Sequence, residues 1–130
     1  MKRGGDAMKK VIVPVSDRNG LNAGIAEHFG RAPFYVTVTL DNDGKVENVE
    51  TVENKGEHFG GKGHMHEHIL ERKPNAIITF GMGPRGLTGF QEAGVAVLKA
   101  NADIVKDVIA SYNDDQLQEL TEGCHRARHH

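Results

Sequence analysis

The spacing of hydrophobic and polar positions changes along the chain, and each change marks an expected element. Residues 11–15 are short, β-branched and apolar on both faces, which is typical of a buried central strand. Residues 34–40 alternate apolar and polar side chains, which predicts a half-buried strand. The Asp-Asn-Asp-Gly sequence at 41–44 predicts a hairpin turn into a second strand over 45–54. Apolar positions three apart in that strand favour a bulge or an edge position.

The rest of the chain combines helical spacing with short apolar runs. Helical segments are predicted at 21–28, 64–73, 84–93 and 101–112, and further strands at 76–80 and 95–98, both buried. We expect Asn101 to cap the last of these helices, and a short helix to begin the segment after residue 113. Alternation of strands and helices implies right-handed crossovers and parallel strands. With the antiparallel hairpin added, a mixed sheet in an α/β fold is expected.

Composition limits the class of protein. The 130 residues predict one domain over 9–122, with a flexible extension at 1–8 and a flexible tail at 123–130. Hydrophobic residues make up 38% and charged residues 26%, as in ordinary soluble proteins, and no apolar run approaches the ~18 residues that a membrane span needs. A net charge of −2 gives no support for nucleic-acid binding. No signal-peptide pattern is visible, so a cytoplasmic location is expected.

Cysteine and histidine contents are unequal. A single cysteine, Cys124, excludes an internal disulfide, a four-cysteine zinc site and a cluster held by cysteines alone within one subunit. The 8 histidines form three groups: four lie between His58 and His68, three close the chain, and His28 stands alone.

Several segments together resemble a known family. The chain reads VIVPVSD at 11–17 and EHFGRAPF at 27–34, followed by a glycine- and histidine-containing loop at 58–64, GMGPRG at 81–86 and GVAV at 94–97. In this order they resemble the nitrogenase iron–molybdenum cofactor biosynthesis and carrier family, over about residues 8–122.

This resemblance implies a fold and a role. The fold would be a three-layer, ribonuclease-H-like α/β fold with a five-stranded mixed sheet. The role would be non-enzymatic binding and delivery of an anionic metal–sulfur cofactor of the Fe-Mo-S, Fe-S or Mo-Cu-S type, which we expect to be lost on purification. Cofactor donor and acceptor proteins would be the partners, and no nucleic acid or membrane partner is expected. The chain would be a monomer or a weak dimer.

His28 and Arg31 follow the first strand, near the carboxyl ends of the parallel strands where open α/β sheets bind ligands. Imidazole is a good ligand for iron or copper, and a guanidinium complements an anionic cluster. The resemblance implies that a histidine in this kind of position binds cofactor in some carriers. In the alternative interpretation, His28 only caps a short helix and Arg31 pairs with Glu27.

The histidines at 58–68 form a second candidate metal site. On a helix, His64 and His68 lie four residues apart on one face, which is the spacing that two metal ligands need. On an extended segment, His64, His66 and His68 would share a face instead. The alternatives are adventitious binding of nickel or zinc, and a solvated glycine-rich loop that includes His58 and leads into a polar helix start.

Gly81, Gly83 and Gly86 form a G-x-G-x-x-G string between a strand and a helix. Such loops direct backbone N–H groups at phosphate, but this one follows a late strand and Pro84 removes one donor. A tight turn is the simpler interpretation. Alternatively, this loop and Arg85 contact an anionic cluster.

The tail carries Cys124 and His125, with His129 and His130 at the end of the chain. A thiolate favours iron–sulfur or copper species. The alternative is a disordered end with a free thiol, in which the last two histidines are an expression-tag remnant. No acid–base partner accompanies a nucleophile, so no catalytic residue is predicted. Besides the carrier hypothesis, two others stay open: an α/β interaction or regulatory module without a cluster, and a phosphate- or nucleotide-binding protein using residues 81–86.

Overall fold

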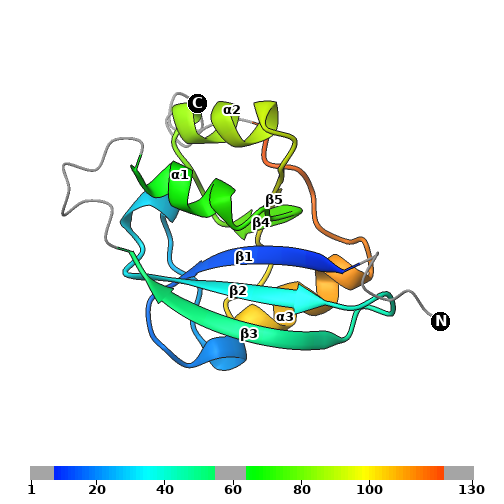
Figure 1. The fold of residues 1–130 in the computed structure, drawn as a ribbon. Helices are drawn as coiled ribbons and strands as arrows, with labels where there is room; N and C mark the ends of the chain where they lie inside the picture. Colours follow the sequence, from blue (N-terminus) through cyan, green and yellow to red (C-terminus); the bar gives the residue numbers. More distant parts are fainter. Residues whose placement is uncertain (1–7, 55–63, 122–130) are drawn as a thin grey trace.

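The computed structural model describes residues 8–54 and 64–121, excluding the side chains of 64–67. Five strands form one sheet in the order β3-β2-β1-β4-β5 (Figure 1). The strands are β1 (Lys9–Val15), β2 (Phe34–Leu40), β3 (Val46–Glu53), β4 (Ala76–Thr79) and β5 (Ala96–Lys99). The α-helices are α1 (His64–Glu71), α2 (Pro84–Glu92) and α3 (Val105–Asn113).

Strand pairing confirms the predicted mixed sheet. β1 is antiparallel to β2 and parallel to β4, β4 is parallel to β5, and β2 and β3 form the expected antiparallel hairpin. Within the described sheet β3 is an edge strand, and its register shifts opposite Thr39 and Leu40, so both the edge position and the irregularity are confirmed.

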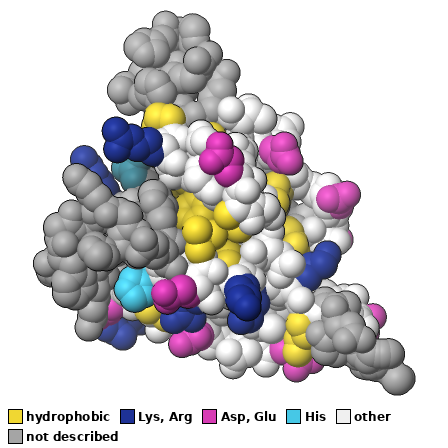
Figure 2. All heavy atoms as spheres, turned by 45° about the horizontal axis from the view of Figure 1, so that its top comes forward, with side chains coloured by type: hydrophobic (Ala, Val, Ile, Leu, Met, Phe, Trp, Pro, Cys, Tyr) yellow, Lys and Arg dark blue, Asp and Glu magenta, His cyan; other side chains and the backbone are white. Residues whose placement is uncertain are grey.

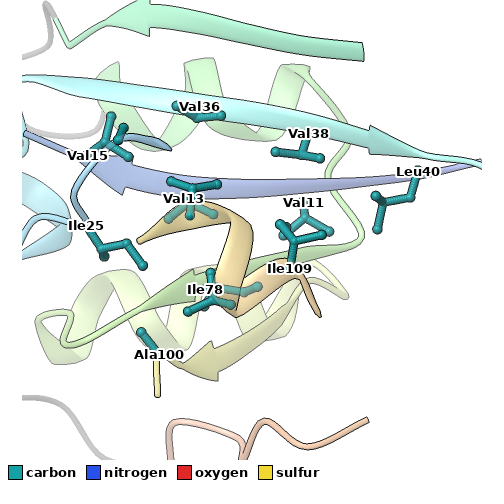
Figure 3. Close-up of a cluster of buried hydrophobic side chains, with 13 residues drawn as sticks. Val11, Val13, Val15, Ile25, Val36, Val38, Leu40, Ile78, Ala100 and Ile109 are labelled. Atoms are coloured by element: carbon teal, nitrogen blue, oxygen red, sulfur yellow. The ribbon is translucent and has the colours of Figure 1, made fainter. Parts of the chain in front are cut away.

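Helices cover both faces of the sheet. In Figure 1, α1 and α2 lie on one face and α3 on the other. Alternate residues of the central strand enter two cores: Val11, Val13 and Val15 pack towards α3 (Figure 3), whereas Ile12 packs with Ile69 of α1 and with residues of α2. This two-sided burial explains why β1 reads as a continuous apolar run. No helix in the described part of the chain is long and apolar enough to cross a membrane.

The prediction of a helix at 21–28 is wrong. The segment contains a 3₁₀ turn, η2 (Gly20–Asn22), then extended backbone with isolated bridges, and a second 3₁₀ turn, η3 (Phe29–Arg31). Ile25 pairs with Val15, and its N–H donates to the carbonyl of Asp103 at 2.8 Å. Hydrogen bonds to distant parts of the chain therefore replace those that a local helix would make.

Burial in two strands also differs from the prediction. β2 was expected to be half-buried, but Tyr35 and Thr37 on its polar-looking face are 4% and 5% exposed because α1 and α2 cover that face. β5 was expected to be a buried strand; it is only partly buried, and in the described sheet it lies at the edge.

The region around α3 needs two further corrections. Ile104, not Asn101, is the N-cap of α3, and the Asn101 side chain instead donates to Ser111 Oγ at 3.2 Å. The described chain after α3, residues 114–121, is not a helix. It runs along β5, where the Leu120 N–H donates to the Val97 carbonyl at 2.9 Å.

Candidate functional site

Two loops meet where the neighbouring parallel strands β1 and β4 end. The loop after β1 carries His28 and the η3 turn, and the loop after β4 leads through Gly81 into α2. The N–H of Phe29 donates to the carbonyl of Gly81 at 3.1 Å. The two segments that the sequence singled out at 28–31 and 81–85 are therefore joined directly.

Phe29 anchors the first loop. Its ring is 1% exposed and lies 5.1 Å from the ring of Tyr35 and 5.6 Å from that of Phe90, the latter edge-on. Its carbonyl accepts a 2.6 Å hydrogen bond from the Tyr35 hydroxyl. On either side of this buried residue, His28 and Arg31 are exposed. The anchoring role of Phe29 was not predicted; its only signal in the sequence is one aromatic residue within a polar, glycine-containing segment.

The second loop is a tight strand-to-helix turn. Gly81 is buried, and both its N–H and its carbonyl are hydrogen-bonded to Thr79 Oγ1, at 3.4 and 3.0 Å. Gly83 is the N-cap of α2 and Pro84 occupies its first turn, as predicted. The neighbouring Arg85 side chain is exposed.

The backbone of the two loops is not covered by side chains at Gly30 and Gly83. Neither has a positive φ, and a Cβ added to either would meet nothing within 4 Å. Backbone conformation and packing in the described structure therefore do not require glycine at these positions. Neither N–H has a hydrogen-bond partner among the described residues.

The arginines of this region differ from the other arginines that the structure describes. Arg18 and Arg72 form 3.0 Å ion pairs with Glu53 and Glu50 on β3. Arg31 and Arg85 form no ion pair with any described residue, so the expected alternative pair between Arg31 and Glu27 is not found there.

The capping alternative for His28 is not found either, because the helix expected at 21–28 is absent; His28 is instead the N-cap of η3 and makes no capping bond through its side chain. Figure 2 views the molecule from the α2 side and shows histidine, Lys or Arg, and acidic side chains along one border of this face. The two loops and the start of α2 thus carry an exposed imidazole, two exposed guanidinium groups and uncovered glycine backbone.

The other candidate metal ligands are only partly placed. His64, His66 and His68 belong to α1, so the helical alternative for this segment is the one observed, and His68 is exposed. The remaining predicted ligands lie outside the described residues: His58, Cys124, His125, His129 and His130. Within the described part of the chain, no group of three or more His, Cys, Asp or Glu side chains is arranged to hold a metal ion.

A hollow of about 500 Å³ lies at the other end of β1, between the β2–β3 turn and the end of α3. It is lined by Lys9, Leu40, Asp41, Asn42, Asp43, Gly44, Tyr112, Asn113 and Asp115. The carboxylates of Asp41, Asp43 and Asp115 in this hollow would repel an anionic cofactor.

Comparison with known proteins agrees with the resemblance seen in the sequence. The uncharacterized protein MJ0580 of Methanocaldococcus jannaschii is 28% identical over 115 residues, covering 87% of this chain and 92% of that protein. The crystal structure of PH0822 is similar at 27% identity, with a TM-score of 0.71 over 85% of this chain and 94% of that one. The apo form of the orange protein from Desulfovibrio gigas shares the fold, with 20% identity and a TM-score of 0.73 over 88% of this chain and 95% of that one. A family profile described as "Dinitrogenase iron-molybdenum cofactor" matches residues 9–115, and the chain therefore belongs to this family.

Proposed function

We propose that this protein binds an anionic metal–sulfur cofactor of the iron–molybdenum or iron–sulfur type on the surface formed by residues 28–31 and 81–85. It carries the cofactor in the cytoplasm from a donor to an acceptor protein, without catalysing a reaction. One observation carries the proposal: Arg31 and Arg85 lack ion-pair partners among the described residues. Arg31 lies on the first loop and Arg85 in the first turn of α2, directly after the second loop, and the two loops are joined by the hydrogen bond between Phe29 and Gly81. Family membership supports the same class of ligand.

Each group on this surface has a chemical role in the proposal. The two guanidinium groups balance negative charge and donate hydrogen bonds to sulfur or oxygen atoms of the cofactor. The uncovered N–H groups of Gly30 and Gly83 are further donors at positions where no side chain stands between backbone and ligand. His28 supplies a metal ligand through its imidazole. His64, His68 and Cys124 remain proposed additional metal ligands of the complete chain.

The same surface favours a carrier over the nucleotide-binding alternative. The Gly81 N–H bonds to Thr79 within the protein, and Pro84 has no N–H to offer. The glycine string therefore lacks two of the donors that would surround a phosphate. Few direct metal ligands, supplemented by charge and hydrogen bonds, give binding that is readily reversed, which suits delivery.

Anaerobic loading tests the proposal. The protein is incubated with tetrathiomolybdate, or with iron and sulfide, then desalted and analysed for bound metal. We expect the wild type to retain metal and the Arg31→Gln/Arg85→Gln double variant to bind about 100-fold more weakly, since a tenfold loss per arginine corresponds to about 1.4 kcal/mol. His28→Ala should also lower retention.

A matched control changes the net charge equally. Arg18→Gln/Arg72→Gln removes two arginines that already have carboxylate partners, so retention should stay close to that of the wild type. An equal loss in both double variants would mean that overall charge, not this surface, holds the ligand. A wild type that retains no metal would refute the carrier function, and ATP-dependent chemical shifts at residues 81–86 would support the nucleotide alternative.

A further inference from the structure

A chain of hydrogen bonds runs from Asn54 to the turn that carries His28 and Arg31. The Asn54 side-chain N–H donates to the Tyr35 hydroxyl at 3.3 Å, and that hydroxyl donates to the Phe29 carbonyl at 2.6 Å. Because the phenol oxygen accepts from Asn54, its single proton is directed to Phe29. The Tyr35 side chain is held at 4% exposure against the Phe29 ring, so the acceptor carbonyl faces the protein interior.

Asn54 holds the rest of the turn in the same way. Its side-chain N–H donates to the carbonyl of Ala32 at 2.8 Å and approaches that of Gly30 at 3.5 Å. Its backbone N–H donates to the carbonyl of Pro33 at 2.9 Å. Together with the Tyr35 hydroxyl, Asn54 therefore draws four carbonyl groups of residues 29–33 to one side of the turn.

This arrangement sets the direction of one N–H group. In a trans peptide the C=O of one residue and the N–H of the next point in opposite directions, and no peptide bond in the described chain is cis. The Phe29 carbonyl accepts from the Tyr35 hydroxyl at 2.6 Å and, over a longer 3.5 Å, from the Ala32 N–H, so it points inward and the Gly30 N–H points away from the interior. That N–H has no partner among the described residues, and no side chain lies within 4 Å of where a Cβ of Gly30 would stand.

We propose that Tyr35 and Asn54 are positioning residues that fix the Phe29–Gly30 peptide plane, so that the Gly30 N–H, not the Phe29 carbonyl, is presented to the ligand. The reversed plane would present a carbonyl oxygen, which repels an anion. The identity of the ligand rests on the proposed function, whereas the orientation of the Phe29–Gly30 peptide plane is a property of the free protein. Because both side chains act through the backbone of the turn, neither needs to touch the cofactor.

The test uses Tyr35→Phe, which keeps the ring and removes only the hydroxyl. In ¹⁵N-labelled protein without ligand, the N–H residual dipolar coupling of Gly30 reports the orientation of the peptide plane. We expect this coupling to be reduced or changed in sign in Tyr35→Phe, and to shift in the same direction in Asn54→Ala. Tetrathiomolybdate, titrated anaerobically, should bind Tyr35→Phe about tenfold more weakly than the wild type.

Ile78→Val is the matched control, because Ile78 is buried on the opposite face of the sheet, towards α3, and its truncation destabilises the protein without reaching the turn. It should keep both the Gly30 coupling and the affinity of the wild type.

An unchanged Gly30 coupling in Tyr35→Phe would overturn the positioning role, as would a changed coupling with undiminished affinity. If the wild type does not bind tetrathiomolybdate, the ligand function itself fails; a wild type that binds alongside a Tyr35→Phe variant that binds equally well contradicts the positioning role alone.

Discussion

Three threonines should respond in different directions to the same change, Thr to Val. Thr37 is 5% exposed, and its Oγ1 is buried without a hydrogen-bond partner among the described residues. Thr39, two residues along the same strand, is half-buried, so its hydroxyl can reach water. Thr79 is fully buried, but its hydroxyl bonds to both the N–H and the carbonyl of Gly81.

The size of each effect follows from the surroundings of the hydroxyl. A buried hydroxyl without a partner costs about 1–3 kcal/mol, so Thr37→Val should raise the free energy of unfolding by about 1–2 kcal/mol. The entropy of unfolding is about 2.1 cal/mol/K per residue; for 130 residues this gain raises Tm by roughly 4–7 °C. Thr39→Val should change the free energy of unfolding by less than about 0.5 kcal/mol. Thr79→Val leaves the Gly81 N–H without its partner and should cost about 1–3 kcal/mol.

Urea unfolding followed by far-UV circular dichroism measures all three variants, and an unchanged m-value would show that the denatured state is unaffected. The informative result is the order of the midpoints: Thr37→Val above the wild type, Thr39→Val equal to it and Thr79→Val below. A Thr37→Val variant no more stable than the wild type would refute the reasoning, because it would mean that the native hydroxyl is satisfied.

Two further predictions concern Gly83 and Asp41. Gly83→Ala should change the free energy of unfolding by less than about 0.5 kcal/mol, because a poorer N-cap offsets reduced chain entropy, yet lower metal retention in the desalting assay. Gly89→Ala, within the same helix and equally open, should raise the free energy of unfolding by about 1 kcal/mol and leave retention unchanged. Hydrogen bonds from the backbone N–H of Lys45, and from that of Asp43, lower the pKa of Asp41 below its ordinary 3.8. The ionised carboxylate therefore stabilises the fold above that pH. This contribution is lost as the pH falls through the folded-state pKa. The stability advantage of the wild type over Asp41→Asn should therefore shrink in urea titrations between about pH 6 and pH 2; an advantage independent of pH would contradict it.

Elements governed by local chemistry could be predicted from the sequence. The β2–β3 turn is specified by Asp41, which accepts hydrogen bonds from the backbone of Asp43 and Lys45, and by Gly44, whose φ of 85° suits glycine. The start of α2 follows from Pro84 at the first helical position. In both cases the determining residues lie within a few positions of the structure that they specify.

Elements governed by distant partners could not be predicted in this way. Leu21 and Ile25 have the spacing of a helix, yet the Ile25 N–H bonds to Asp103 and the Ala23 carbonyl accepts from Val105. Similarly, Thr37 looks like a solvent-facing strand residue until helices cover its face of the sheet. Nothing near these residues in the sequence reveals the partners that bury or pair them.

The residues of the candidate site also differ in whether their roles could be predicted from the sequence. His28, Arg31 and Arg85 could be found from the sequence because they are chemically distinctive and follow strands whose carboxyl ends share one edge of a parallel pair. Phe29 and Tyr35 could not, since an aromatic residue in a loop or strand is more often only part of the core.

The exposed residues proposed to bind the ligand and the buried residue that positions them should respond differently to substitution. His28, Arg31 and Arg85 are exposed, so their substitution should cost less than about 0.5 kcal/mol of stability while weakening the proposed binding. The buried Phe29 donates its N–H to the Gly81 carbonyl, accepts a hydrogen bond from the Tyr35 hydroxyl and packs its ring in the core. Stability and binding should therefore be lost together when Phe29 is changed. The residues that carry the proposed chemistry can be replaced singly, whereas the residue that brings them together cannot.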